Sequence, residues 1–455
     1  MRKSLLILTL VSCVAGSTSG AEVHVNEIKT IPRIDGLVTT AGRPSVHNGI
    51  IVLGQIEPNN VGVTYNARTG ALDTWGGSDD PVDTTRNALG FFQNEQTGVG
   101  GKWAVVGGAP EVQSLNIPIK VVDLETMTRI DVLPDPAVAS GVDQHFFDIN
   151  ANGDLVWVNF ISGTSDATLV WANMADPAAQ VVLPTELGGT SQHPRISTES
   201  GRRITYSPNS TTHRVFDLNT MTDYLVYEST TGENVLRSRI SDDGNWIIGN
   251  HRPAGETLKR SDIILVNVKD LERPVSSNLT KNPSVIREDP NIEIMDADSA
   301  IVVWGQDSTP EVEDGYDIYA AVLTGLSTSN PVLDAPVLLA PNDGAQRGNR
   351  FPVIDGDLVA WSYHWIDTGS QTVQYMWISA VPQTRIISER KTANAFELTF
   401  LTAAGFRYTV EFTESVKSSS WSSLPVVVGT GSEVTVLHPE PSPAASFYRV
   451  RVEHP

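Results

Sequence analysis

The stretch Ile240-Ser-Asp-Asp-Gly-Asn-Trp-Ile-Ile-Gly249 decides the fold, because two short apolar runs are joined through a turn rich in Asp, Asn and Gly. Gly and Asn accept the positive φ angles of tight turns at little cost. An Asp side chain can hydrogen-bond the backbone of such a turn. The stretch therefore predicts a β-hairpin with Gly244 in its turn and with Asp243 bonded to the turn backbone.

The same pattern recurs along the chain. Val353-Ile-Asp-Gly-Asp-Leu-Val-Ala-Trp361 is another copy, in which Asp355 takes the place of Asp243, and a further apolar run such as Tyr316-Asp-Ile-Tyr-Ala-Ala-Val322 often follows. A long repeat built from short strands indicates an all-β fold, a β-propeller with four-stranded blades. Seven blades are expected, with six or eight left open because the first units are irregular. The units start near Ser45, Leu89, Phe146, Arg195, Arg239, Asn291 and Phe351.

The segment Glu22–Ile34 precedes the first unit and alternates in polarity, as in Val23-His-Val25. A strand from the other end of the chain removes the open edge of the last blade and closes the ring. We therefore expect this segment to add an outer strand to the last blade.

Residues 384–455 follow a different sequence pattern from the repeats. Alternation runs through segments such as Phe406-Arg-Tyr-Thr-Val-Glu-Phe412, and the intervening turns are rich in Gly and Ser. A period of two is typical of strands with one buried face and one solvated face. We expect a small antiparallel β-sandwich, with Tyr408 in its core and with Thr409 and Glu411 facing water.

The first residues have the pattern of an export leader. Arg2-Lys3 are charged, an apolar run follows, and Ser19-Gly-Ala21 places small residues where a signal peptidase cleaves. Residues 1–21 are expected to be a signal peptide and residues 22–383 the propeller. The protein is therefore expected to be periplasmic, extracellular or on the cell surface.

Cys13 is the only cysteine of the chain. Cleavage after Ala21 leaves no thiol, which excludes disulfides, thiol catalysis and zinc–thiolate sites. An alternative stays open, because Leu10-Val-Ser-Cys13 resembles a bacterial lipobox that would place a lipid on Cys13. No later stretch approaches the ~18 apolar residues that a membrane-spanning helix needs.

The formal net charge of −21 bears on the partners of the protein. An acidic surface repels phosphate backbones, which argues against nucleic acid. The simplest consequence of the charge is solubility, and an acidic binding face is the alternative. Metalloprotease, Walker, serine-hydrolase and EF-hand patterns are all missing from the sequence after residue 21.

One unit resembles a known repeat. Ser241-Asp-Asp-Gly244, Ser261-Asp-Ile-Ile264 and Asn278-Leu-Thr280 follow the order of the TolB-type propeller repeat. The segment Tyr408-Thr-Val-Glu411 belongs to a tail that is similar to C-terminal sandwich modules of exported bacterial proteins. The resemblance implies a propeller fold and supplies no catalytic residues, because propellers host binders and enzymes alike.

Polar side chains recur where the chain enters the first strand of each predicted blade. Equivalent positions in successive blades converge around one axis, so we expect these side chains to form a rim. Guanidinium and imidazole groups suit a carboxylated ligand, whereas the simpler alternative is that long polar residues line a wet rim. The candidate ligand-binding residues are Arg43, His145, His193, Arg237, Asp289 and Arg350.

Two of these residues stand in repeated pairs, Gln144-His145 and Gln192-His193. Two imidazoles can hold a divalent metal, so His145 and His193 are candidate metal ligands, although no cofactor is otherwise expected. This layout resembles that of seven-bladed oligogalacturonate lyases, which implies His and Gln ligands around a metal. No third ligand is evident in the sequence.

These observations favour an exported, monomeric, non-enzymatic propeller that binds or scaffolds a protein or an acidic glycan. One alternative is a lyase or hydrolase that acts on acidic oligosaccharides at the rim. Another is a periplasmic interaction module of TolB type. The sequence does not choose a ligand, because the repeat accounts for the fold and not for a reaction.

Overall fold

The structure is a computed structural model. It describes residues 21–32, 44–55, 61–75, 97–106, 119–132, 142–161, 167–184, 193–197, 202–229, 234–256, 260–281, 284–308, 315–342, 347–365, 371–382, 386–392, 395–402, 406–413, 421–430, 432–439 and 447–453. Strands and turns make up the regular structure of these ranges, which contain no helix. The all-β prediction is confirmed. Within the same ranges there is accordingly no helix with the length and apolarity needed to cross a membrane.

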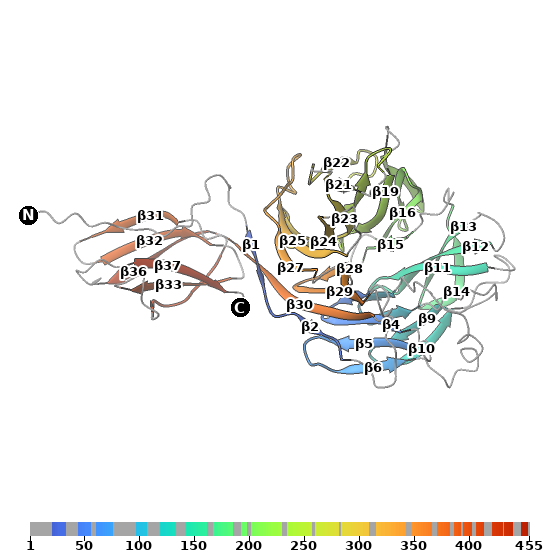
Figure 1. The fold of residues 1–455 in the computed structure, drawn as a ribbon, viewed down its shortest axis with the longest axis horizontal. Coiled ribbons are helices and arrows are strands. Elements are labelled where there is room, and N and C mark those ends of the chain that lie inside the picture. The colour runs from blue at the N-terminus through green and yellow to red at the C-terminus, as the bar shows by residue number, and fades with distance from the viewer. Residues whose placement is uncertain are drawn as a thin grey trace, which may run out of the picture. The chain divides into compact units, whose positions relative to one another are not determined.

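The described residues up to Pro382 form seven antiparallel sheets of four or five strands, and we number them as blades 1 to 7 along the chain (Figure 1). Blade 1 contains β3 (Ser45–His47), β4 (Ile50–Gln55), β5 (Val61–Asn66) and β6 (Leu72–Trp75). Blade 2 contains β7 (Thr97–Gly100), β8 (Trp103–Val106), β9 (Ile119–Asp123) and β10 (Thr128–Val132). Blade 3 contains β11 (Val142–Ile149), β12 (Asp154–Ile161), β13 (Ala167–Asn173) and β14 (Asp176–Val182).

The later blades repeat this order. Blade 4 contains β15 (Arg195–Ile196), β16 (Arg203–Asn209), β17 (Thr212–Asp217) and β18 (Thr222–Glu228). Blade 5 contains β19 (Asn234–Ile240), β20 (Trp246–Arg252), β21 (Asp262–Asn267) and β22 (Val275–Asn278). Blade 6 contains β23 (Ile286–Ile294), β24 (Ser299–Asp307), β25 (Asp317–Thr324), β26 (Val332–Leu333) and β27 (Val337–Ala340). Blade 7 contains β28 (Arg347–Asp355), β29 (Leu358–Trp365), β30 (Gln371–Pro382), β1 (Ala21–Val25) and β2 (Lys29–Thr30).

The first strands of the blades form a closed ring. Each one contacts the first strand of the next blade, in the order β3, β7, β11, β15, β19, β23 and β28, and β28 returns to β3. We call these seven the inner strands. The fold is therefore a seven-bladed β-propeller, as predicted.

Blade 7 receives a strand from the start of the chain. Both β1 and β2 pair with β30, which confirms the outer strand expected from residues 22–34. Lys29 pairs with Tyr375, and the backbone NH of Ile31 donates to the carbonyl of Val373 at 3.0 Å. The first described residues thus hydrogen-bond to the last blade.

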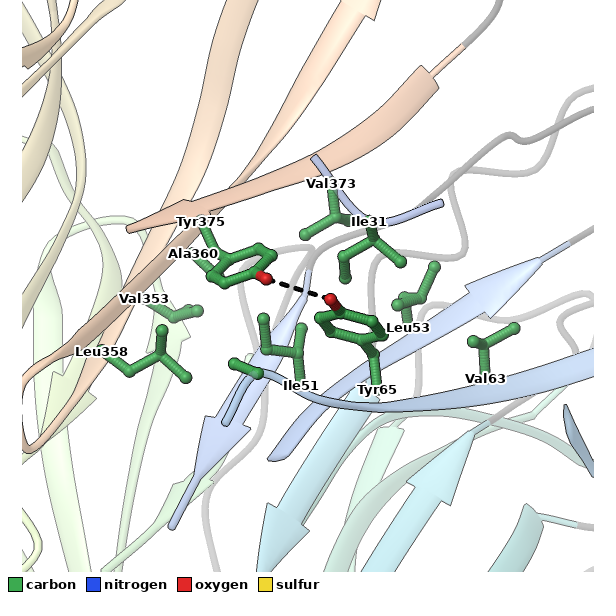
Figure 2. Packing of buried hydrophobic residues seen from close by; sticks show 11 residues of the cluster. Ile31, Ile51, Leu53, Val63, Tyr65, Val353, Leu358, Ala360, Val373 and Tyr375 are labelled. Atoms are coloured by element: carbon green, nitrogen blue, oxygen red, sulfur yellow. Dashed lines mark hydrogen bonds between the residues drawn. The ribbon is translucent and has the colours of Figure 1, made fainter. Parts of the chain in front are cut away.

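The seam between blades 1 and 7 is apolar (Figure 2). Ile51 and Tyr65 of blade 1 pack with Leu358 and Tyr375 of blade 7, and all four side chains are buried. The hydroxyl groups of Tyr65 and Tyr375 are 3.0 Å apart and hydrogen-bond across the seam. Burial of such side chains contributes roughly 1.5–3 kcal/mol each, so this seam is held by its core as well as by the β1 and β2 ladder.

The inner strands begin earlier than predicted in several blades. Phe146, Arg239, Asn291 and Phe351 were expected as starts, but β11, β19, β23 and β28 begin four or five residues before them. Each of these strands has a register shift near its middle. A bulge interrupts the alternation of side chains, which explains why the apolar run in the sequence begins only after it. The expected start at Leu89 lies outside the described residues.

The hairpin of blade 5 has the predicted turn. Gly244 has a φ of 71°, and the Asp243 carboxylate accepts the backbone NH of Asn245 at 3.0 Å. The Ser241 hydroxyl donates to the same carboxylate and accepts the NH of Trp246 at 3.0 Å. The turn is therefore fixed by its own side chains.

Replacing Gly244 by valine is expected to lower the free energy of unfolding by about 1–3 kcal/mol, because a β-branched residue is strained at positive φ. Urea denaturation measures this change. Ser276→Val, on the exposed outer strand of the same blade, is the control and is expected to stay within about 0.5 kcal/mol of the parent. Equal stability of the two variants would show that the turn tolerates a side chain.

The C-terminal region forms two small antiparallel sheets that share one apolar cluster. One sheet contains β31 (Ile386–Lys391), β32 (Ala395–Leu401) and β36 (Glu433–Pro439). The other contains β33 (Arg407–Thr413), β34 (Ser422–Ser423), β35 (Val427–Val428) and β37 (Phe447–Glu453). Phe400 and Tyr408 are fully buried in the cluster between them, which makes the region a small β-sandwich.

Two exposure predictions for this sandwich are wrong. Thr409 and Glu411 are buried, although their alternation pointed to water. Arg449 and Arg451 of β37 lie beside Glu411, with their Nε atoms 2.6 and 3.3 Å from its carboxylate oxygens. Long side chains on the neighbouring strand thus cover the outer face of β33, which lies between β37 and the short strands β34 and β35.

The backbone divides into two compact units. Among the described residues, those from 25 to 378 form one unit, and residues 21–24 together with those from 379 to 453 form the other. The expected division at 383/384 falls a few residues later, after the end of β30. The expected leader falls almost wholly on residues 1–20, outside the described residues.

Candidate functional site

The predicted rim residues belong to the starts of the inner strands. His145 lies in β11 and Arg237 in β19, but only their backbone positions are described, and Arg43 is outside the described residues. His193 is half-buried just before β15, and its successor Pro194 is buried. The joint placement of His145 and His193 around one ion stays a prediction.

The register shifts show which rim positions are equivalent. The last paired residue before the shift is His145 in β11, Leu236 in β19, Glu288 in β23 and Arg350 in β28. Arg237 and Asp289 come one residue later, inside the bulge. The two Gln-His pairs are therefore not at the same position, because His145 lies three residues before Asp148 whereas His193 lies two residues before Arg195, the first residue of β15.

Two of the predicted residues meet around a tyrosine that the sequence analysis assigned only to a strand. The Arg350 guanidinium is exposed and lies 5.6 Å from the ring centroid of Tyr316. Tyr316 forms a bridge with Asn349, which places it beside the start of β28. Its hydroxyl hydrogen-bonds Glu288, and the charge of Asp289 acts on it. We call Glu288, Asp289, Tyr316 and Arg350 the Tyr316 cluster.

The electrostatics of this cluster keep its hydroxyl protonated. Burial raises the pKa of Tyr316 well above its ordinary value, and the carboxylates of Glu288 and Asp289 raise it further, while Arg350 opposes them. Asp289 is buried and has a φ of 51°, in the left-handed region. Phe351, at the same place in the bulge of β28, has a φ of 56°, so this backbone conformation belongs to the bulge.

A second charged group lies one step further along the inner strands. In blades 3 and 5, the first paired residues after the register shifts are Asp148 and Arg239. In blade 4, Arg195 is the first residue of the inner strand. The Asp148 carboxylate accepts the backbone NH of Ile196 at 3.1 Å. Burial raises the pKa of Asp148, and the charges of Arg195 and Arg239 partly offset this effect. The repeated Arg-Ile-Ser in Arg195-Ile-Ser197 and Arg239-Ile-Ser241 could have revealed this group.

A third group lies where the inner strands end. His47 ends β3, Asp355 ends β28, and Asp242 follows β19 in the turn of blade 5. One ligand atom from each lies within 4.8 Å of the others. We call these residues the hairpin triad. Asp355 was expected to bond its own turn, but its carboxylate binds His47 Nδ1 at 3.0 Å and accepts the NH of Asn48 at 2.7 Å.

A hydroxyl–imidazole pair occurs in blade 4 and does not form a catalytic site. Ser207 Oγ and His213 Nδ1 are 2.7 Å apart, the spacing of an activated serine. Both side chains are buried, with 4% and 0% exposed. Burial lowers the pKa of His213 to about 3, which makes it a weak base. A substrate cannot reach this pair, so it is part of the core.

Comparisons with known proteins show the fold. No protein-family model matches the sequence, and a comparison with curated proteins finds no match. The chain is similar to the WD40 repeats of RRP9, with 11% identity, a TM-score of 0.51, and coverage of 79% of this chain and 100% of that chain. It is similar to a chain of the mitotic checkpoint complex, with 10% identity, a TM-score of 0.50, and coverage of 82% and 99%.

A solved structure of an oligogalacturonate lyase in complex with manganese is also similar, with 9% identity, a TM-score of 0.49, and coverage of 80% of this chain and 99% of that chain. At such low identities the likeness extends to the fold alone. The comparisons therefore support a β-propeller and leave the ligand to be argued from the residues.

Proposed function

We propose that the protein is an exported, non-enzymatic binding propeller that holds a carboxylate-bearing ligand at the starts of its inner strands. The observation that supports this most directly is the exposed Arg350 guanidinium above the Tyr316 ring. An aromatic ring orders the guanidinium, and its fork of NH donors suits a carboxylate. The hydrogen bond between the Tyr316 hydroxyl and Glu288 helps to hold this ring in place.

The other predicted rim residues extend this proposal. His193 precedes the inner strand of blade 4, and Arg237 lies in that of blade 5. In the proposed site these two residues and Arg43 supply further donors to an acidic ligand. Residues 22–383 act as the propeller and residues 384–455 as a separate module. Residues 1–21 direct export, as their charged and apolar pattern suggests.

Replacing Arg350 by alanine is expected to weaken binding of an acidic ligand by about 10- to 100-fold, the effect of losing a charge-assisted hydrogen bond. The probe is an oligosaccharide of uronic acids, compared with its uncharged counterpart by calorimetry. Arg273→Ala is the matched control, because Arg273 is highly exposed and pairs with Asp270 in the turn between β21 and β22, outside the inner strands. The double variant His145→Ala/His193→Ala tests the rest of the rim.

The outcomes separate the possibilities. Binding of the acidic probe alone, lost in the Arg350 variant and kept in the Arg273 variant, supports the proposal. Conversion of the probe to shorter products would show an enzyme instead. If all variants bind like the parent, the starts of the inner strands are not the ligand site.

A further inference from the structure

The hairpin triad joins three blades that are far apart in the sequence. His47 belongs to blade 1, Asp355 to blade 7 and Asp242 to blade 5. Blades 1 and 7 are neighbours in the ring, but blade 6 separates blade 5 from blade 7. The turn of blade 5 must therefore extend toward the other two for its carboxylate to come within 4.8 Å of their ligand atoms.

The spacing of the triad suits one small cation. Two ligand atoms about 2.1 Å from one ion, at an angle of about 90–110°, lie about 3.0–3.4 Å apart. His47 Nδ1 and Asp355 Oδ1 are 3.0 Å apart. An Asp242 oxygen lies within 4.8 Å of both atoms, which makes Asp242 the candidate for the third ligand.

The neighbouring residue holds two of the ligands in place. The backbone NH of Asn48 donates to Asp355 Oδ2 at 2.7 Å, which leaves Oδ1 directed at His47. The Asn48 side-chain amide nitrogen lies 2.9 Å from His47 Nε2. In this orientation the amide donates to Nε2, and the ring hydrogen on Nδ1 is directed at Asp355. Metal binding at Nδ1 displaces that hydrogen, and a half-turn of the amide lets its oxygen accept from Nε2–H instead.

The burial of the triad also differs from that of ordinary surface carboxylates. The His47 side chain is 9% exposed and the Asp355 side chain 15% exposed. Two carboxylates placed together out of bulk water repel each other unless a positive charge lies between them. An imidazolium or a metal ion can supply that charge.

We propose that the hairpin triad binds one divalent transition-metal ion, with His47 Nδ1 and one oxygen each from Asp242 and Asp355 as ligands. One imidazole and two carboxylates are the ligands of Zn²⁺ and Mn²⁺ sites, whereas Ca²⁺ takes six to eight oxygens. The ion ties blade 5 to blades 1 and 7 across the ring. This site is separate from the proposed ligand site, because it lies at the ends of the inner strands and not at their starts.

Calorimetry with Zn²⁺ alone, on tag-free protein freed of metal with a chelator, tests the proposal. The parent is expected to bind one equivalent, and Ca²⁺ is expected to bind far more weakly. Asp242→Asn should weaken Zn²⁺ binding by at least about 100-fold, because loss of a ligand costs at least as much as loss of an outer partner. Asp357→Asn is the matched control, since this exposed carboxylate lies two residues from Asp355 and pairs with Arg68.

A thermal melt gives a second readout. Zn²⁺ should raise the melting temperature of the parent and of Asp357→Asn, and it should leave that of Asp242→Asn unchanged, because a ligand that binds only the folded state stabilises it. Asp242→Asn is preferred to a change at His47 or Asp355, because its carboxylate lies in a turn and not in a strand.

Three results would overturn the proposal. The first is a parent protein that binds no Zn²⁺, which would make the triad a proton-mediated ion pair. The second is an Asp242→Asn variant that binds like the parent, which would place the ion elsewhere. The third is an equal loss of Zn²⁺ affinity in Asp357→Asn, which would show that any nearby negative charge has the same effect. None of these results depends on the acidic ligand at the other end.

Discussion

Replacing Gly100 by alanine is expected to lower the free energy of unfolding of the propeller by about 3 kcal/mol. Gly100 ends β7 in blade 2 and lies against the backbone of blade 3. A Cβ atom on it would lie 2.6 Å from Asn150 Cα and 2.7 Å from the nitrogen of Ala151. Such separations are far below ordinary contact, and the atoms are backbone, so a rotation of a side chain cannot relieve them.

The backbone of blade 3 is also poorly able to move. The Asn150 side chain is fully buried, and its oxygen accepts the NH groups of Asn152 and Asp154 at 3.0 and 2.9 Å. Moving this turn would disturb the hydrogen bonds that shape it. The added methyl group should therefore push blades 2 and 3 apart rather than displace the turn alone.

Gly305→Ala is the matched control for this test. Gly305 lies within β24, and a Cβ there would meet Tyr316 Cβ at 3.5 Å, an ordinary contact. Urea denaturation should give a near-parental free energy for Gly305→Ala and a much lower one for Gly100→Ala. Equal values for the two variants would show that blades 2 and 3 adjust to the methyl group.

The architecture was predictable because the repeat is local. Turns such as Ser241–Trp246 carry their own side-chain acceptors, and the apolar runs on either side encode short strands. The closing strand was predictable as well, since an alternating segment before the first blade has the last blade as its natural partner. The burial of Glu411 was not, because it depends on Arg449 and Arg451, which belong to a strand almost forty residues away.

The candidate sites were harder to predict from the sequence than the fold. The register shift in β11 lies between His145 and Asp148, so His145 is three residues before the first pair that follows the shift. His193 is only two residues before the start of β15. The periodicity of a single sequence does not reveal such a bulge. The hairpin triad was missed because His47 and Asp242 belong to hairpins nearly two hundred residues apart. Only the ring of inner strands brings them together.

Replacing Arg202 by methionine is expected to lower the free energy of unfolding at neutral pH by about 3 kcal/mol, the effect of breaking a buried ion pair from one side. Asp154 of blade 3 is completely buried. Its two oxygens accept Nε and a second guanidinium nitrogen of Arg202, both at 2.9 Å, across the junction with blade 4. Methionine keeps the length of the side chain and removes the donors.

The effect should depend on pH in a defined direction. Burial alone would raise the pKa of Asp154, but hydrogen bonds from Arg202, Asn173 and Asn150 outweigh it and hold the pKa below its usual value. The unfolded chain thus binds a proton more readily than the folded one. The stabilisation is complete above the unfolded pKa of about 4 and is lost as the pH falls through the folded pKa.

The difference between the parent and Arg202→Met should therefore be largest at pH 7 and shrink steadily below about pH 4. Urea denaturation across this range measures it. Arg129→Met is the control, because Arg129 forms a partly exposed pair with Asp131 at 2.9 Å, and such surface pairs contribute about 0–1 kcal/mol. A loss in Arg202→Met that matched the control, or that did not change with pH, would show that Asp154 relies on Asn150, Asn173 and the Trp171 indole NH without the guanidinium.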